Sequence, residues 1–110
     1  VLFVQDISNN LEEVLATNQY VFVQFSVPWC AFTQIAEEEW ENFYNANNDS
    51  DVVIANVNCD IIKDCQNKDK YDIKGFPSYI LFKDGNKNAE FKPTYPRQQQ
   101  IFQEWLNRQM

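Results

Sequence analysis

The residues from Val21 to Thr33 constrain the fold more than any other stretch of the chain. They read Val-Phe-Val-Gln-Phe-Ser-Val-Pro-Trp-Cys-Ala-Phe-Thr. The first part is an almost unbroken run of β-branched and aromatic residues, which is typical of a strand covered on both faces. Pro28 cannot donate a hydrogen bond to a neighbouring strand, so it ends this one. We therefore predict a buried strand from Tyr20 to Phe25, followed by a short turn.

A helix is predicted directly after the turn, from Ala31 to about Ala46. A cysteine, Cys30, lies at or next to its N-terminus. Free backbone N–H groups and the helix dipole favour an anion there. Such settings lower a thiol pKa from about 8.5 to roughly 3.5–7.5, and the thiolate is the reactive form. The alternative is an inert, buried cysteine. The apolar residues expected on one face of this helix are Phe32, Ile35, Ala36, Trp40 and Phe43.

Strands and helices alternate along the rest of the chain. The resulting order, β-α-β-α-β-α-β-β-α, predicts an α/β fold with a mixed sheet and helices on both faces. No internal repeat is visible. The remaining expected elements are a strand at Val1–Val4, a short helix opened by a capping box from Asn9 to Glu12, a strand at Val52–Val57, a weak helix at Ile61–Tyr71, strands at Tyr79–Lys83 and Lys87–Phe91 joined by a turn at Asp84–Asn86, and a helix at Arg97–Arg108.

Composition narrows the class of protein. The 110 residues are enough for one domain, covering 1–110, and the chain is acidic, with a net charge of −7 and no histidine. Nucleic acid is not expected as a partner, because phosphate contacts require clustered lysine and arginine. No window is apolar enough to span a membrane, so no membrane contact is expected. The chain starts in a strand-like segment without a visible signal peptide, so we expect either an excised domain, as part of a multidomain chain, or a mature fragment.

Six ordered segments resemble the thioredoxin superfamily, and in particular protein disulfide isomerase domains. They are Val-Leu-Phe-Val, Tyr-Val-Phe-Val-Gln-Phe, Pro-Trp-Cys, Tyr-Asp-Ile-Lys-Gly-Phe-Pro-Ser, Leu-Phe-Lys-Asp-Gly and Glu-Trp-Leu. Together they cover nearly the whole chain and imply a thioredoxin fold. The family follows the first cysteine with two residues and a second cysteine. Here Thr33 takes that place, so the motif is a monothiol Cys-Ala-Phe-Thr.

The resemblance also assigns roles to residues outside the motif. It implies a cis peptide bond between Phe76 and Pro77, and an apolar peptide-binding surface formed by Trp29, Phe32, Phe76 and Pro77. For Phe32, core packing is an equal alternative. Gln24 stands where the family carries a buried acid, and it is also compatible with an ordinary strand residue. Arg97 aligns with an arginine that tunes the second cysteine, although it also fits the start of the last helix.

The other two cysteines, Cys59 and Cys65, fall where some isomerase domains carry a structural disulfide. Pairing them would leave Cys30 as the single free thiol of three. A metal site is not expected, because the chain has no histidine and only two local thiols. No cofactor is expected either.

These observations predict a monothiol, isomerase-like domain of the endoplasmic reticulum lumen or secretory pathway. It would form mixed disulfides at Cys30 with cysteine-containing client proteins or peptides, with weak isomerase activity at most. Thr33 sits one turn from Cys30 and its hydroxyl can hydrogen-bond the thiolate, but a hydroxyl cannot attack a disulfide. Two alternatives remain: a redox-inactive peptide- or protein-binding module, and a cytosolic thioredoxin-like protein. The expected Cys59–Cys65 bridge disfavours the cytosolic alternative.

Overall fold

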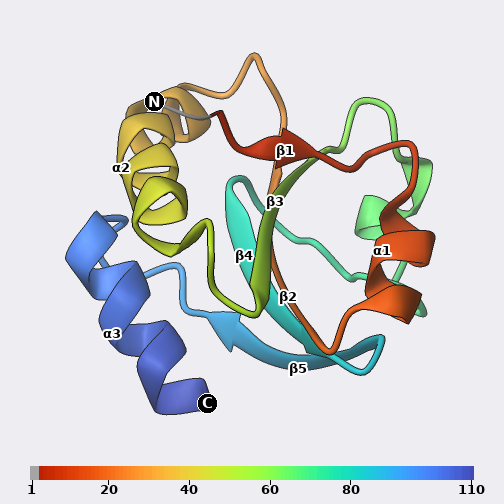
Figure 1. Cartoon of the computed structure of the whole chain (residues 1–110). Coiled ribbons are helices and arrows are strands. Elements are labelled where there is room, and N and C mark those ends of the chain that lie inside the picture. The colour runs from red at the N-terminus through yellow and green to blue at the C-terminus, as the bar shows by residue number, and fades with distance from the viewer. Residues whose placement is uncertain (1–2) are drawn as a thin grey trace.

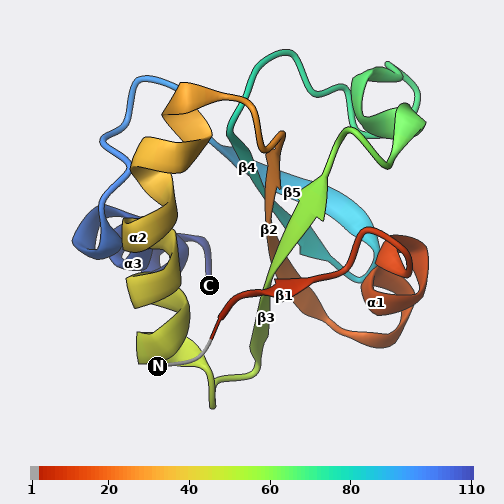
Figure 2. The same cartoon turned by 90° about the horizontal axis from the view of Figure 1, so that it is seen from above.

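The β-branched and aromatic run after Gln19 forms the central strand of a five-stranded sheet (Figures 1 and 2). The structure is a computed structural model that describes residues 3–110. Its elements are β1 (Gln5–Asp6), α1 (Leu11–Thr17), β2 (Tyr20–Ser26), α2 (Ala31–Asn47), β3 (Val52–Asn58), a 3₁₀ turn η1 (Lys63–Gln66), β4 (Ser78–Lys83), β5 (Asn86–Phe91) and α3 (Gln99–Gln109).

The strand order in the sheet is β1-β3-β2-β4-β5. Strands β1, β3 and β2 run parallel, whereas β4 and β5 are antiparallel to their neighbours. Strand β2 is therefore paired on both edges, and its side chains are buried on both faces, as its hydrophobic run predicts. Its register sets Gln24 beside Asn56 of β3 and Tyr79 of β4, so three polar side chains share one row across the middle of the sheet.

Helices cover both faces of the sheet, as expected from the order of elements. Figure 2 shows α2 and α3 together on one face, and α1 with the segment around η1 on the other. The core under α2 and α3 is mainly aromatic, whereas the core under α1 is mainly aliphatic. The aromatic side chains of the first core are Phe22, Trp40, Phe43, Tyr79, Phe91, Phe102 and Trp105.

Helix α2 is rotated relative to the face expected from its sequence. Its buried residues are Thr33, Ala36, Trp40 and Phe43. Phe32 and Ile35, expected on the buried face, are instead 64% and 76% exposed, so that part of the prediction is wrong. The buried row follows the i, i+3, i+7 spacing from Thr33, which a polar residue at its first position conceals in the sequence.

Three further expectations, about the ends of the predicted elements, also need correction. The expected first strand lies partly at residues 1–2, outside the described residues, and β1 is Gln5–Asp6 instead. The N-cap of α1 is Asn10, and no side-chain cap hydrogen bond is seen there within residues 3–110, so the capping box is wrong. The last helix begins at Gln99, which leaves Arg97 outside it.

The weak helix expected from Ile61 to Tyr71 is only the short turn η1. Cys59 and Cys65 are joined by a disulfide across this segment, with their Cα atoms 5.8 Å apart. The backbone N–H of Ile73 then donates to the Cys65 carbonyl at 2.7 Å. These two links hold the segment as a compact loop, and the loop leads directly into Phe76 and Pro77.

Candidate functional site

Cys30 is the N-cap residue of α2, at the end of the turn that Pro28 begins. Its backbone N–H donates to the Val27 carbonyl at 3.2 Å, and its own carbonyl accepts the N–H of Gln34 at 3.2 Å. The residue is half-buried, so Cys30 is not a fully buried core cysteine. The thiol donates to the Phe76 carbonyl, with Sγ and O 3.8 Å apart, and the Phe76–Pro77 peptide bond is cis.

Thr33 faces inward beneath Cys30, one turn along α2. It is 8% exposed, and its Oγ1 has no hydrogen-bond partner among residues 3–110. A buried hydroxyl without a partner costs about 1–3 kcal/mol. The hydroxyl can rotate and donate to the sulfur when Cys30 is ionised. A hydrogen bond from this hydroxyl to the sulfur would favour the thiolate of Cys30.

The pKa of Cys30 is lowered from its ordinary value of 9.0. The largest cause is a hydrogen bond from the backbone N–H of Thr33, to which the N–H of Phe32 and the Thr33 hydroxyl add. Partial burial opposes the shift, and the positive charge of Arg97 favours it. The first turn of α2 thus stabilises the thiolate, as a helix N-terminus is expected to do.

The position of the family's buried acid holds a neutral hydrogen-bond network. The Tyr79 hydroxyl donates to Gln24 Oε1 at 2.8 Å, and Gln24 Nε2 donates to Asn56 Oδ1 at 3.2 Å. The same Oδ1 accepts the indole N–H of Trp40 at 2.7 Å. Burial raises the pKa of Tyr79, so its phenol keeps its proton. Gln24 acts here as a satisfied core residue, and no carboxylate accompanies it in this network.

Aromatic side chains lie beside Cys30, and two of them, Trp29 and Phe32, are exposed. Trp29 is 68% exposed, and its ring meets Phe76 edge to face with centroids 6.5 Å apart. The Trp29 indole N–H donates to Asp60 Oδ1 at 3.1 Å, which ties the ring to the loop closed by the disulfide. Together with exposed Phe32, these rings form an apolar border beside the cysteine, whereas Pro77, which the sequence predicts on this surface, is buried beneath it. Large exposed apolar side chains gathered in one place are typical of interaction sites.

A groove of about 620 Å³ lies along this border. Phe32, Phe76, Pro77 and Pro93 form its apolar part. Arg97 also lines it, half-buried and outside α3. Sequence reasoning left two roles open for Arg97, and the structure places it in the groove and close enough to lower the Cys30 pKa. No lysine or arginine lies within ten residues of Cys30 in the sequence, so it is the fold that brings this cation close to the cysteine.

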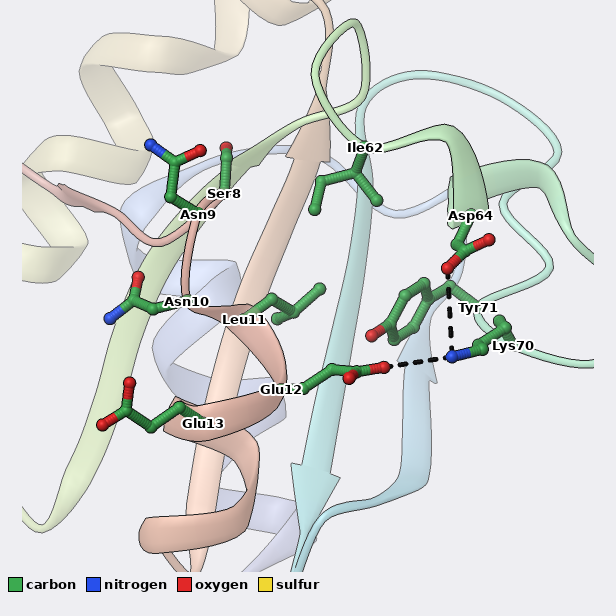
Figure 3. Close-up of a pocket in the computed structure, with 10 residues that line it drawn as sticks. All are labelled: Ser8, Asn9, Asn10, Leu11, Glu12, Glu13, Ile62, Asp64, Lys70 and Tyr71. Carbon is green, nitrogen blue, oxygen red and sulfur yellow. Dashed lines mark hydrogen bonds and ion pairs between the residues drawn. The ribbon is translucent and has the colours of Figure 1, made fainter.

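A second hollow, of about 450 Å³, lies beside α1 on the other face (Figure 3). Figure 3 shows Lys70 between two carboxylates, with Nζ 3.0 Å from Glu12 and 3.8 Å from Asp64. Its cation is therefore already neutralised by its neighbours. Among the described residues that line this pocket there is no cysteine, so thiol chemistry belongs to the groove beside Cys30.

A comparison with protein-family models identifies the thioredoxin model as a match to residues 3–108. The chain belongs to the thioredoxin family. The α/β fold with its mixed sheet, expected from the sequence, is confirmed. Within the described residues, this thioredoxin domain has no helix that is both long and apolar enough to cross a membrane.

Curated relatives of this thioredoxin domain are protein disulfide isomerases. It is 32% identical over 103 residues to protein disulfide-isomerase 1 of Dictyostelium discoideum, covering 93% of this chain and 28% of that protein. It is 30% identical over 105 residues to the protein disulfide-isomerase of Zea mays, covering 93% and 20%. The chain thus spans between a fifth and just over a quarter of the length of these relatives.

Solved structures with the same fold include a human protein and a parasite thioredoxin. Human ERp44 in crystal form I superposes with a TM-score of 0.83 at 22% identity, over 98% of this chain and 30% of that one. Oxidised thioredoxin from Plasmodium falciparum superposes with a TM-score of 0.75 at 15% identity, over 96% of both chains. At these identities the likeness extends to the fold alone.

Proposed function

We propose that this domain is a monothiol exchange domain that binds client proteins through mixed disulfides at Cys30. The observation that carries the proposal is the placement of Cys30. Cys30 is half-buried at a helix N-terminus, the pKa of its thiol is lowered by backbone N–H groups, and its sulfur faces the Phe76 carbonyl beside an apolar groove.

The chemistry is a single exchange. The Cys30 thiolate attacks one sulfur of a client disulfide, a new S–S bond forms at Cys30, and the client's other sulfur leaves as a thiolate. In a dithiol site, a second cysteine would then displace the client. Here Thr33 has only a hydroxyl, so the client remains attached until another thiol arrives. Net dithiol oxidation or reduction is expected to be negligible, and isomerase activity weak at most.

We propose the surface formed by Trp29, Phe32, Phe76 and Pro77 as the client contact. Three of these residues line the groove, and the exposed ring of Trp29 stands beside it. An extended peptide that places its cysteine at Cys30 would bury the exposed rings of Trp29 and Phe32 and the remaining surface of half-buried Phe76, whereas Pro77 is already buried in the free domain. Burial of exposed aromatic rings is a principal source of binding free energy at peptide sites.

The proposed setting is an oxidising compartment, the endoplasmic reticulum lumen or secretory pathway. The Cys59–Cys65 disulfide supports it, because such bridges are rare where thiols are kept reduced. The protein disulfide isomerases it resembles are several times longer than this chain. We therefore propose that residues 1–110 form one domain of a multidomain protein.

The test is trapping of clients in cells, with mixed disulfides preserved by acid quenching and separated under non-reducing conditions. Cys30→Ala is expected to remove the client adducts, because no other free thiol is present in the chain. Thr33→Ser keeps the hydroxyl and is the matched control, and it is expected to retain them. Equal client capture by Cys30→Ala and the parent would overturn the proposal.

A second candidate is a peptide-binding module without redox chemistry. The observation that favours it is the exposed apolar row of Phe32 and Ile35, which needs no thiol to bind a partner. The two candidates differ in the reaction of Cys30 with iodoacetamide near neutral pH. Fast alkylation supports exchange, whereas an unreactive Cys30 supports the binding module.

A further inference from the structure

One asparagine of this chain meets the sequence requirement for N-linked glycosylation. The acceptor motif is Asn-x-Ser or Asn-x-Thr, in which x is any residue except proline. Asn48-Asp49-Ser50 satisfies it, whereas every other asparagine of the chain lacks a serine or threonine two positions later. The motif lies between α2 and β3, in a part of the chain that the thiol chemistry does not use.

The motif lies on the surface of the domain. Helix α2 ends at Asn47 and β3 begins at Val52, and every residue of the connection between them is exposed. The backbone N–H of Ser50 donates to the Asn47 carbonyl at 3.0 Å, which closes a turn with Asn48 and Asp49 at its central positions. Within residues 3–110, the Ser50 hydroxyl bonds to the backbone of Val52 alone, at the long distances of 3.3 and 3.4 Å. Both groups that define the motif are therefore accessible to an enzyme.

The side-chain amide of Asn48 has no role in holding the fold together. Within residues 3–110 it forms no hydrogen bond. The amide of the preceding Asn47 differs, because its Nδ2 donates to the Phe43 carbonyl at 2.8 Å and to Gln103 Oε1 at 2.7 Å. A sugar attached to Asn48 would therefore displace no bond of the domain, whereas one attached to Asn47 would disturb the contact between α2 and α3.

The motif and the reactive cysteine lie at opposite ends of α2. Cys30 is the N-cap residue of this helix and Asn48 is its C-cap residue. The 17 residues of α2 span about 25 Å at a rise of 1.5 Å per residue. Figure 2 shows the connection from α2 to β3 at the end of the helix that lies away from the turn before it. A glycan at Asn48 would leave the groove beside Cys30 open.

We propose that Asn48 is an N-glycosylation site. The inference goes beyond the exchange function but rests on the proposed setting, because the transferase that reads this motif acts in the lumen of the endoplasmic reticulum. An attached glycan is bulky and hydrophilic. It would keep the end of the domain that joins α2 to β3 in solvent, so clients and neighbouring domains would contact other faces.

The attachment is a group transfer with one co-reactant, an oligosaccharide linked to a lipid through pyrophosphate. The Nδ2 atom of Asn48 attacks the anomeric carbon of the first sugar. One N–C bond forms, the C–O bond to the pyrophosphate breaks, the lipid pyrophosphate leaves, and the amide nitrogen loses one proton. No atom of the protein is oxidised or reduced, so the state of the cysteines does not enter the balance.

The experiment locates the glycan on the natural full-length protein that carries residues 1–110, produced in eukaryotic cells. Peptide-N-glycosidase F in heavy-oxygen water converts a glycosylated asparagine to a labelled aspartate, which peptide mass spectrometry places in the sequence. The label is expected at Asn48. Asn48→Gln and Ser50→Ala are each expected to abolish it. Ser50→Thr is the matched control, since it changes the same side chain but keeps the motif, and it should retain the label.

A reporter motif shows independently whether the chain meets the transferase. Asn88→Thr turns Asn86-Lys87-Asn88 into an acceptor motif on exposed residues at the start of β5. A threonine is well tolerated in a strand. Combined with Asn48→Gln, this change leaves Asn86 as the one acceptor within residues 1–110. The label is then expected at Asn86.

The outcomes separate this inference from the proposed function. If the reporter is labelled at Asn86 but the parent is unlabelled at Asn48, the glycosylation site is overturned and the proposed setting stands. If neither position is labelled, the setting and this inference fail together, while client trapping at Cys30 still tests the exchange chemistry. The parent and Asn48→Gln are expected to show equal alkylation of Cys30 by iodoacetamide, and unequal rates would contradict the placement of the glycan away from the groove.

Discussion

The two sulfur sites of this domain show how far the environment decides what a cysteine does. Cys30 lies at the N-terminus of a 17-residue helix, half-buried and unbridged. Cys65 lies in the aliphatic core on the opposite face of the sheet, 1% exposed and bonded to Cys59. At the first site, hydrogen-bond donors converge on the sulfur. At the second site, the Cys59–Cys65 disulfide closes a loop, and the hydrogen bond from the Ile73 N–H to the Cys65 carbonyl stabilises that loop further.

The comparison shows that the bridged site supports the reactive one. The loop closed by the Cys59–Cys65 disulfide connects the two. The Cys59–Cys65 bridge holds the segment that leads to Phe76, whose carbonyl faces the Cys30 sulfur. Asp60, next to the bridge, holds the indole of Trp29. The structural sulfurs thus shape one wall of the reactive site while remaining outside its chemistry.

Adding a sulfur at the reactive site is expected to have the largest effect. Thr33→Cys places a thiol where a dithiol site has its second cysteine, and an intramolecular attack on a trapped client should be far faster than release by an external thiol. We expect insulin reduction to rise by roughly 100-fold or more over the parent.

Thr33→Ser is the control for this gain, because it changes the same side chain but keeps the hydroxyl and adds no thiol. It should show no increase in insulin reduction. A Thr33→Cys variant that stays inactive although Cys30 still reacts with iodoacetamide would mean that the remainder of the site cannot support dithiol exchange.

Removing the Cys59–Cys65 disulfide tests whether this second site is purely structural. The double variant Cys59→Ala/Cys65→Ala should lower the free energy of unfolding by about 2 kcal/mol, since the bridge closes only a short loop. Urea denaturation measures this. Cys30→Ala is the control and should change the stability by less than about 0.5 kcal/mol. Equal losses in the two variants would contradict the division into one reactive and one structural site.

Removing the Thr33 hydroxyl has a smaller and more specific effect. Thr33→Val keeps the shape but deletes the buried donor, so the pKa of Cys30 should rise toward its ordinary value. The pH dependence of alkylation measures that shift. Because the hydroxyl lacks a partner in the thiol state, stability at acidic pH should be unchanged or greater by up to about 1 kcal/mol. An unchanged alkylation profile would show that the backbone N–H groups alone hold the thiolate.

The smallest expected effect is the pH dependence of stability at Cys30. The pKa of this thiol is lower in the folded chain than its ordinary value of 9.0, so folding favours the ionised form. The stabilisation is complete above the ordinary value and is lost as the pH falls through the folded value. The stability difference between the parent and Cys30→Ala should therefore grow in favour of the parent as the pH rises toward 9.0. The bridged cysteines do not titrate and contribute nothing to this trend.

Much of this protein was determined by local sequence signals. The hydrophobic run of Tyr20–Ser26, the proline that ends it and the helical spacing after it place Cys30 at a helix N-terminus without reference to the rest of the chain. The turn between β4 and β5 is equally local, since Asp84 and Gly85 both adopt positive φ, as a two-residue hairpin requires. Such features depend on short-range sterics and hydrogen bonds, which a sequence displays directly.

Other features were decided by the tertiary structure. The rotation of α2 that buries Thr33 and exposes Phe32 depends on how the aromatic core packs against it, which helical spacing alone does not specify. The expected helix after Ile61 gave way to a loop, because a disulfide and long-range backbone bonds outweigh a weak local preference. Arg97 reaches the surroundings of Cys30 from 67 positions along the chain. Charges so distant in sequence become neighbours only when the sheet and its loops are assembled, because electrostatic interactions depend on distance in space and not along the chain.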